Sequence, residues 1–412
     1  MTEMTIKAER RSLVARWSVP LVLMCCVVLA FFDKISIAVL FSDPGFRNDL
    51  GIGSDPERMG ALMTSFLLAY GLSSAVLGFV GDLVSPRRCL LWLMVSWAVL
   101  MAAMGLSSSY RSMLWLRVAL GVAEGPLFAL AYAIVKQTYP PRQQARATML
   151  WLLGTPIGAA LGFPITACIL GHFGWRVSFF ALAGLTLLVM ALIVPVLRRS
   201  ENTVAPDSAA TNASGRPVVE WEALRALFGN RCFWAVCLFN VAFLTYLWGL
   251  NTWLPTYLHE GKGINLGSVG VYASLPFIGM LLGEVVGSFV SDRFDKRALQ
   301  CLVSLTFAGL GLFAVLAIRS HYPMITAMTF SAMLWGVGAP NVFALLAKVV
   351  PAEVSATAGG VFNGAGNIAG AAAPLLIGSL IAHTGSVSAG ILYLAAIALL
   401  GGLVLLPLVR RY

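Results

Sequence analysis

The chain has 412 residues, of which 59% are hydrophobic and only 11% are charged. Because about a quarter of the residues of soluble globular proteins are charged, this composition excludes a soluble globule and indicates a membrane protein with many spans. The net charge of +10 does not require nucleic acid as a partner, because Lys and Arg collect in the inner loops of membrane proteins.

Apolar segments near the ~20 residues that a helix needs to cross a bilayer follow one another along the whole chain. Twelve are predicted, at residues 18–41, 60–80, 89–108, 112–136, 147–170, 175–197, 232–257, 267–290, 300–318, 323–348, 356–382 and 387–409. A basic tail precedes the first, and no small-residue cleavage site follows it, so we expect no cleaved signal. With the N-terminus inside, most Lys and Arg fall in inner connections. We therefore predict an all-α membrane protein of twelve transmembrane helices with both termini cytoplasmic.

Cysteine and histidine give no sign of a metal or redox site. The seven cysteines include no CxxC pair and lie mostly within apolar segments, which is typical of small packing residues. The four histidines fall at or near outer connections. We expect no metal and no cofactor, and carboxylates are left as the carriers of any protons.

A polar stretch at residues 198–231 separates two halves of the chain, residues 1–197 and 232–412. We interpret it as a flexible cytoplasmic linker followed by a short amphipathic piece near Trp221. Three landmarks of the first half recur 210 residues later, namely Asp82 as Asp292, Pro141 as Pro351 and Pro164 as Pro374. Six helices per half keep the repeats parallel, as in transporters whose halves rock about a midplane site.

Glycines recur at helical spacing in three segments. They are Gly154, Gly158 and Gly162; Gly279, Gly283 and Gly287; and Gly360, Gly364, Gly366 and Gly370. Small residues on one helix face allow backbones to approach closely. Static packing is one interpretation, but the segments hold equivalent places in the two halves, so we expect these faces to open and close.

A motif at Gly78-Phe-Val-Gly-Asp82 with Arg87 and Arg88 resembles the loop between the second and third helices of the major facilitator superfamily. A second copy contains Asp292, Arg293 and Arg297. The resemblance implies the fold of that superfamily, two six-helix bundles, with these residues gating the cytoplasmic side. Leu83 departs from the motif, because the family usually has a basic residue there, so the first latch is expected to be weaker.

Further residues resemble the anion:cation symporter branch of this superfamily, which includes permeases for sugar acids, aromatic acids and dicarboxylic acids. The matching positions are Asp33-Lys34, Tyr70, Arg117 with Glu124, and Asn363 with Asn367. Lys34 stands where arginine is common, so bidentate binding of a carboxylate is not expected at that position. In the family the equivalent carboxylates couple proton entry to anion uptake.

Depth along the helices gives an independent indication of the site. At 1.5 Å per residue, Asp33 and Arg117 both lie about 8 Å from the outer edge of a ~30 Å core. Glu124 is seven residues after Arg117, on the same helical face and nearer mid-membrane. We predict that Asp33 and Glu124 are the protonatable pair, while Lys34 and Arg117 supply positive charge to Asp33 or to an anionic substrate. A buried ion pair that only fixes helix packing is the alternative.

Other intramembrane polar residues are candidates for substrate contacts. Tyr70 is a possible donor to a carboxylate, or an aromatic packing residue. Tyr246, Asn251, Asn363 and Asn367 are candidates for binding substrate hydroxyls, with hydrogen bonding between helices as the equal alternative. Glu284 is a third intramembrane carboxylate, which we assign to cytoplasmic gating or proton release, or to a water-filled vestibule.

The predicted function is import of a small organic anion with protons, by a monomeric multi-pass protein of the bacterial inner membrane. A proton-coupled exporter of drugs or metabolites is the nearest alternative, and the absence of a Gly-Pro dipeptide at Gly154-Thr155-Pro156 mildly disfavours it. A transporter-like sensor lacks its expected soluble extension. An enzyme is less favoured still, because no nucleophile, base and orienting group cluster at one depth.

Overall fold

The computed structural model describes residues 3–77, 85–139, 147, 150–203, 221–294, 296–350 and 355–411, and their secondary structure is helical. Over these residues eleven helices are long and apolar enough to cross a membrane. The second predicted span, 60–80, is helix α3 (Pro56–Leu77), which is not among the eleven. The first turn of α3 is polar, with Glu57 and Arg58, and its other end borders residues outside the described ranges.

The long helices of the first half form one bundle. They are α1 (Glu3–Leu40), α3, α5 (Pro86–Gly105), α6 (Tyr110–Glu124), α7 (Leu127–Thr138), α9 (Gly154–Phe173) and α10 (Trp175–Thr203), with the short α2 (Pro44–Asp49) after α1. A single predicted span, 112–136, is divided between α6 and α7 at Gly125-Pro126, because proline has no N–H to donate and disfavours helix in the preceding residue.

The second half begins with α11 (Trp221–Gly229), where the amphipathic piece is predicted. Its long helices are α12 (Arg231–Thr256), α13 (Leu266–Phe294), α14 (Arg297–Ala317), α15 (His321–Val349), α16 (Ser355–Thr384) and α17 (Ser388–Leu403). After Pro255, α12 continues into a short π-helix, η2 (Tyr257–Gly261), which agrees with the loss of a helical N–H at proline.

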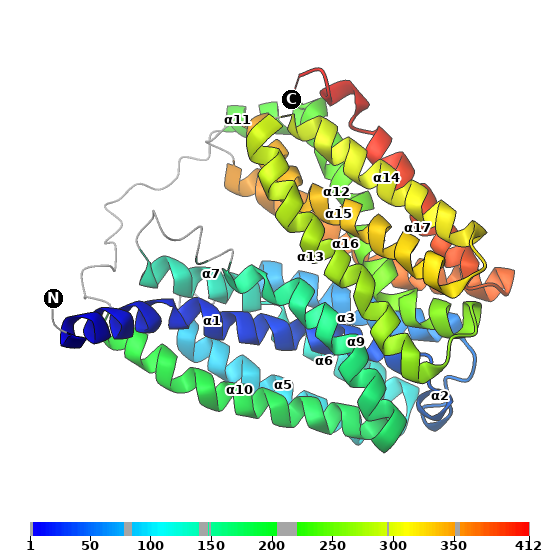
Figure 1. Ribbon diagram of the computed structural model, residues 1–412, viewed down its shortest axis with the longest axis horizontal. Helices are drawn as coiled ribbons and strands as arrows, with labels where there is room; N and C mark the ends of the chain where they lie inside the picture. Colours follow the sequence, from blue (N-terminus) through cyan, green and yellow to red (C-terminus); the bar gives the residue numbers. More distant parts are fainter. Residues whose placement is uncertain are drawn as a thin grey trace.

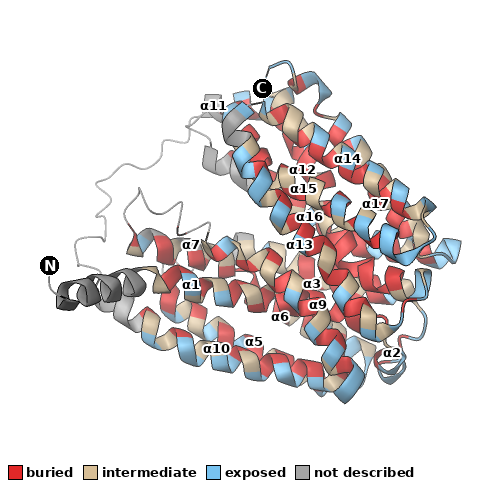
Figure 2. Cartoon of the chain, viewed as in Figure 1, coloured by how far each residue is buried: buried red, intermediate tan, exposed pale blue. Residues whose placement is uncertain are grey.

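The two halves are arranged as a V (Figure 1). They lie apart at the end that holds the N-terminus and α11, and they meet at the end that holds α2. Contacts between the halves join α3 to α16, α9 to α13 and α1 to α12. Buried residues concentrate inside each half and where the halves meet (Figure 2).

The glycine faces that are expected to open and close instead pack inside the halves. A Cβ at Gly158 would overlap Val28 and Phe31 of α1, and one at Gly283 would overlap the backbone of α15. Gly366 and Gly370 lie against α12. For the glycines with a close neighbour this expectation is wrong, because they serve close packing within a bundle; a Cβ at Gly364 would meet no neighbour, and the surroundings of Gly360 lie outside the described residues.

Different glycines bring the two halves together. A Cβ at Gly60 of α3 would overlap the Pro374 carbonyl of α16, and one at Gly378 of α16 would overlap the carbonyl of Pro56. On the other side of the molecule, Gly270 of α13 lies against Phe163 of α9. Backbone contact without an intervening side chain closes this end of the V tightly.

Candidate functional site

Helix α1 buries two adjacent charged residues in the first half. Asp33 is 5% exposed and Lys34 is buried. Neither ends a helix or lies in a loop, because the apolar sequence on both sides continues α1 to Leu40. Such residues are expensive inside a membrane unless they have partners.

The partner of Lys34 is Glu124, the last residue of α6. The Lys34 Nζ atom lies 3.6 Å from a carboxylate oxygen of Glu124, and each side chain is only 1% exposed. The sequence predicts that Lys34 acts on Asp33 or on substrate, whereas in this structure its ion pair is with Glu124. A charge pair this deeply buried is sensitive to any change in the charge of either partner.

Aromatic rings enclose the ammonium group of Lys34 in a cation–π arrangement. Its Nζ atom is 4.0 Å from the ring centroid of Tyr70, 4.8 Å from that of Phe31 and 5.9 Å from that of Phe128. Tyr70 therefore contributes the face of its ring to the site, which is a different use from the predicted hydroxyl donor. The rings stabilise a positive charge away from water.

Close packing of α3 against α6 holds these groups in place. Gly121 lies against the Phe66 carbonyl, and Gly125 lies against the Tyr70 carbonyl, where a Cβ would overlap the backbone of α3. The Ser73 hydroxyl donates to the Val122 carbonyl at 2.6 Å. Tyr70 and Glu124 are brought together because Gly121 of α6 and Gly125, directly after it, allow the helices to touch.

Arg117 is the second buried cation of the cluster and is fully shielded from solvent. Its guanidinium carbon lies 4.3 Å from the Phe66 ring centroid, and Nη2 is 3.6 Å from the Met63 sulfur. Its Nε and Nη1 atoms have no hydrogen-bond partner among the described residues. Arg117 interacts electrostatically with both Asp33 and Glu124. The guanidinium thus keeps donors free for another acceptor.

The side chains of Asp33 and Glu124 interact with each other within the cluster. A hydrogen bond between two carboxyl groups requires that one of them carries a proton. Asp33 Oδ1 and both carboxylate oxygens of Glu124 accept no hydrogen bond from the described residues. The pair is therefore suited to hold a proton between its members.

The second half presents polar groups in two different settings. Asn363 is exposed and Asn367 half-buried, and the Asn367 amide donates to the Asn363 side chain at 2.9 Å. Asn251 is 1% exposed; it donates to the Leu247 carbonyl, and its Oδ1 atom has no partner among the described residues. Tyr246 is fully buried, and its hydroxyl forms a hydrogen bond with the Ser331 hydroxyl at 2.8 Å. This bond joins α12 to α15, as expected for a residue that links helices instead of binding substrate.

The predicted cytoplasmic gating residues are only partly covered by the structure. Asp82 and the side chains of Asp292 and Arg293 lie outside the described residues. Arg87 is buried and donates to the Thr138 hydroxyl at 3.2 Å, whereas Arg88 is exposed. Arg297 begins α14 and is half-buried, as is Glu284 in the middle of α13.

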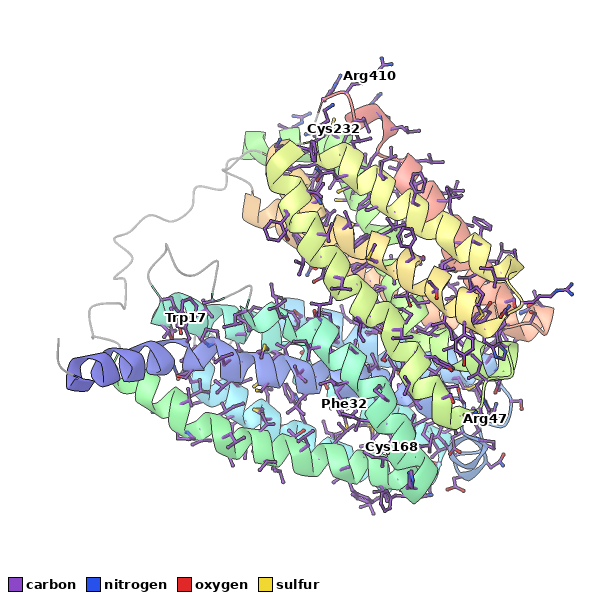
Figure 3. All side chains as sticks on the ribbon, viewed as in Figure 1. Trp17, Phe32, Arg47, Cys168, Cys232 and Arg410 are labelled. Atoms are coloured by element: carbon purple, nitrogen blue, oxygen red, sulfur yellow. The ribbon has the colours of Figure 1, made fainter. Side chains whose placement is uncertain are left out.

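An ion pair that joins the two halves is not apparent in the sequence. Arg47 of α2 donates to Glu260 of η2 at 2.7 Å, at the end of the V where the halves meet (Figure 3). The two residues are 213 positions apart. In the sequence, each is a single charged residue in a predicted connection between helices. No local signal could have paired them.

Helix α2 is itself fixed to the first half by Asp49. The carboxylate of Asp49 accepts hydrogen bonds from Arg176 and from the Trp175 indole, the latter at 3.0 Å. These two donors hold the pKa of Asp49 below its usual value. Gly174, with φ 81°, makes the tight turn that brings Trp175 and Arg176 under α2.

Two bundles of apolar helices, with a buried charged cluster inside the first, are typical of a membrane transporter, and the comparisons with known proteins agree. The family model of the Major Facilitator Superfamily matches residues 23–374 and 262–412. The chain belongs to the major facilitator superfamily and is a multi-pass integral membrane protein of the bacterial inner membrane.

Its relatives support the resemblance to the anion:cation symporter branch. The chain is 26% identical to a hexuronate transporter of Bacillus subtilis, over 93% of this chain and 92% of that protein. It is 24% identical to a probable L-galactonate transporter of Escherichia coli, over 95% of this chain and 88% of that protein. The chain is thus related throughout its length to transporters of sugar acids.

A solved structure supports the fold alone. The crystal structure of a bacterial homologue of the human lysosomal transporter Spinster, inward-facing and unoccupied, superposes with a TM-score of 0.81 at 16% identity. The match covers 96% of this chain and 97% of that chain.

Proposed function

We propose that this chain imports a small organic anion together with protons by alternating access. The substrate is a carboxylate such as a sugar acid, an aromatic acid or a dicarboxylate. In this proposal the chain is a monomer with twelve membrane-spanning helices and cytoplasmic termini, so that the V of Figure 1 is open to the cytoplasm. The observation on which the proposal chiefly rests is the buried pair of Lys34 and Glu124.

A buried ion pair links proton binding to anion binding. When Glu124 gains a proton, it loses the charge that balances Lys34, and the ammonium then requires another anion in surroundings with little water. A substrate carboxylate supplies that charge. The proton and the anion are thereby bound together, as symport requires.

Asp33 and Arg117 extend this exchange. A second carboxyl group beside Glu124 provides another place for a proton, and the unpaired guanidinium donors of Arg117 offer a second contact for substrate oxygens. From the opposite half, we assign Asn363, Asn367 and Asn251 to the hydroxyl groups of the substrate. Asp82, Arg87, Arg88, Asp292, Arg293 and Arg297 remain the proposed gating residues of the cytoplasmic side.

The test is uptake into proteoliposomes of labelled glucuronate, L-galactonate, an aromatic acid and a dicarboxylate, with and without an inward proton gradient. We expect accumulation of one class that depends on the gradient. Glu124→Gln is expected to lose accumulation and to keep substrate exchange, because it fixes the neutral state of the site. Expulsion of neutral or cationic compounds, with no uptake of acids, would show that the protein is an exporter.

A further inference from the structure

Glu284 lies outside the charged cluster of the first half, and its position on α13 indicates which way it faces. Gly270, Phe277 and Glu284 follow one another at intervals of seven residues, about two helical turns, so they share one face of α13. Gly270 lies against Phe163 of α9, and the Phe277 ring stacks on Phe163 at 5.2 Å. This face is therefore the one that α13 turns toward the first half.

The face makes contact with α9 only toward the end where the halves meet. Helices α13 and α9 lie apart toward the end of the V that holds α11 (Figure 1), and α13 runs toward that end after Phe277. Glu284 is half-buried there, and it forms no ion pair with any described residue. Glu284 comes seven residues after Phe277 on α13. If the open end of the V closes, the part of α9 that comes opposite Glu284 is therefore the stretch about seven residues before Phe163, at Pro156 and Ala160.

The stretch of α9 that would cover Glu284 is apolar. Helix α9 has no Asp, Glu, Lys or Arg, and its one histidine, His172, is at the far end. On the other side, Gly336 of α15 packs against the Glu284 backbone, and Met333 to Asn341 include no titratable residue.

The remaining charged groups on helices that pack against α13 lie near the helix ends. Toward the meeting end they are His259, Glu260, Lys262 and His321; toward the open end they are Arg231, Lys296, Arg297 and Lys348. Lys348 is twelve residues along α15 from Gly336, or about 18 Å. An ionised Glu284 would thus be enclosed on closure with no positive charge beside it among the described residues.

We propose that Glu284 binds a proton each time the open end of the V closes, and releases it when that end opens. Burial of an unpaired carboxylate is strongly unfavourable, whereas its protonated form is neutral and can donate a hydrogen bond. The proposal deepens the proposed function and rests on its alternating access. It makes Glu284 a proton site of the second half, separate from Asp33 and Glu124.

The test measures the distance between the halves, not transport, so it gives an answer even if no organic acid is carried. Spin labels are attached to cysteines introduced by Leu152→Cys, next to α9, and Phe289→Cys, on α13, in the full-length protein without its native cysteines. Both positions are exposed, at 39% and 74%. The ratio of closed to open molecules in nanodiscs is then measured between pH 5.5 and 8.

Acidification is expected to raise this ratio, since the closed state binds more protons. One obligatory proton changes the ratio by at most about tenfold per pH unit. Glu284→Gln is expected to reduce the slope of log ratio against pH by up to one and to favour the closed state at pH 8. Glu284→Asp should keep most of the slope, and Glu57→Gln, a change at an exposed carboxylate of α3, should leave it intact.

An unchanged slope in Glu284→Gln, with the label distances of a folded protein, would overturn the proposal. The same series in sodium and in choline buffers separates a proton from a metal cation. If sodium at constant pH closes the native protein but not Glu284→Gln, the residue binds a cation and the proton assignment is wrong.

Discussion

The ammonium of Lys34 and the carboxylate of Glu124 lie 3.6 Å apart inside the first half, and both side chains are 1% exposed. Loss of one partner from such a pair costs about 3–5 kcal/mol, because the other charge remains buried. We therefore expect Lys34→Met to lower the thermal stability of the purified protein clearly. Adding Glu124→Gln should recover most of the loss, since neither charge then remains.

The control for this pair is Lys262→Met, which removes a lysine at the end where the halves meet, whose Nζ donates to the Ile318 carbonyl. It should change the melting temperature much less. If the double variant is as unstable as Lys34→Met alone, the two residues are not energetically coupled, and the pairing seen in the structure does not stabilise the fold.

Two substitutions of Tyr70 distinguish the role of its ring from that of its hydroxyl. Lys34 lies over its ring at 4.0 Å, so Tyr70→Phe keeps the contact and is expected to transport within about twofold of the native protein. Tyr70→Leu removes it and should reduce the rate about tenfold or more, since a desolvated cation–π contact is worth about 2 kcal/mol. Equal damage from both variants would instead support the hydroxyl donor that the sequence predicts.

The ion pair of Arg47 and Glu260 lies at the end where the halves meet, and we expect it to keep that end closed. Partly exposed pairs contribute about 0.5–1 kcal/mol, so Arg47→Gln should raise the population open at this end by about two- to fivefold. The reporter is a cysteine introduced by Thr64→Cys, where the native hydroxyl accepts from the Leu375 N–H across the halves. Its reaction with a membrane-impermeant thiol reagent should accelerate accordingly.

Two variants control this experiment. Arg58→Gln breaks an ion pair with Asp55 inside the first half and should leave the labelling rate unchanged. The charge exchange Arg47→Glu with Glu260→Arg should return the rate toward the native value. Acceleration by Arg58→Gln as well would mean that loss of any charge near this end opens it.

The hydrogen bonds of Asp49 determine over which pH range α2 stays fixed to the first half. Hydrogen bonds from Arg176 and Trp175 lower its pKa below the usual 3.8. Because the folded-state pKa is depressed, the stabilisation is present above about pH 4 and is lost only as the pH falls below that value. Hydrogen exchange of α2 should therefore be independent of Asp49 between pH 5 and 8, after correction for the intrinsic exchange rate. Asp49→Asn should raise the exchange of α2 throughout this range, and a rise in the native protein near pH 6 would contradict the assignment.

Much of the site can be predicted from the sequence, because charged residues are rare within membrane-spanning segments. Asp33, Lys34, Arg117 and Glu124 stand out as charges within apolar segments, and depth along the helices predicts that Asp33 and Arg117 lie at the same level, with Glu124 nearer mid-membrane. The sequence does not show that Lys34 pairs with Glu124, because that choice depends on which faces of α1 and α6 meet. The glycine faces are misassigned for the same reason: spacing identifies a close contact and does not name the neighbouring helix.

The sequence by itself determined that this protein crosses a membrane many times, that it has two related halves, and that buried charge lies in the first of them. These follow from hydrophobicity and periodicity, which are local properties. Only the tertiary structure decided that Arg47 meets Glu260, that Gly60 and Gly378 join the halves, and that Phe277 of α13 stacks on Phe163 of α9. Each of these depends on how helices distant in sequence pack together, and no single segment specifies that.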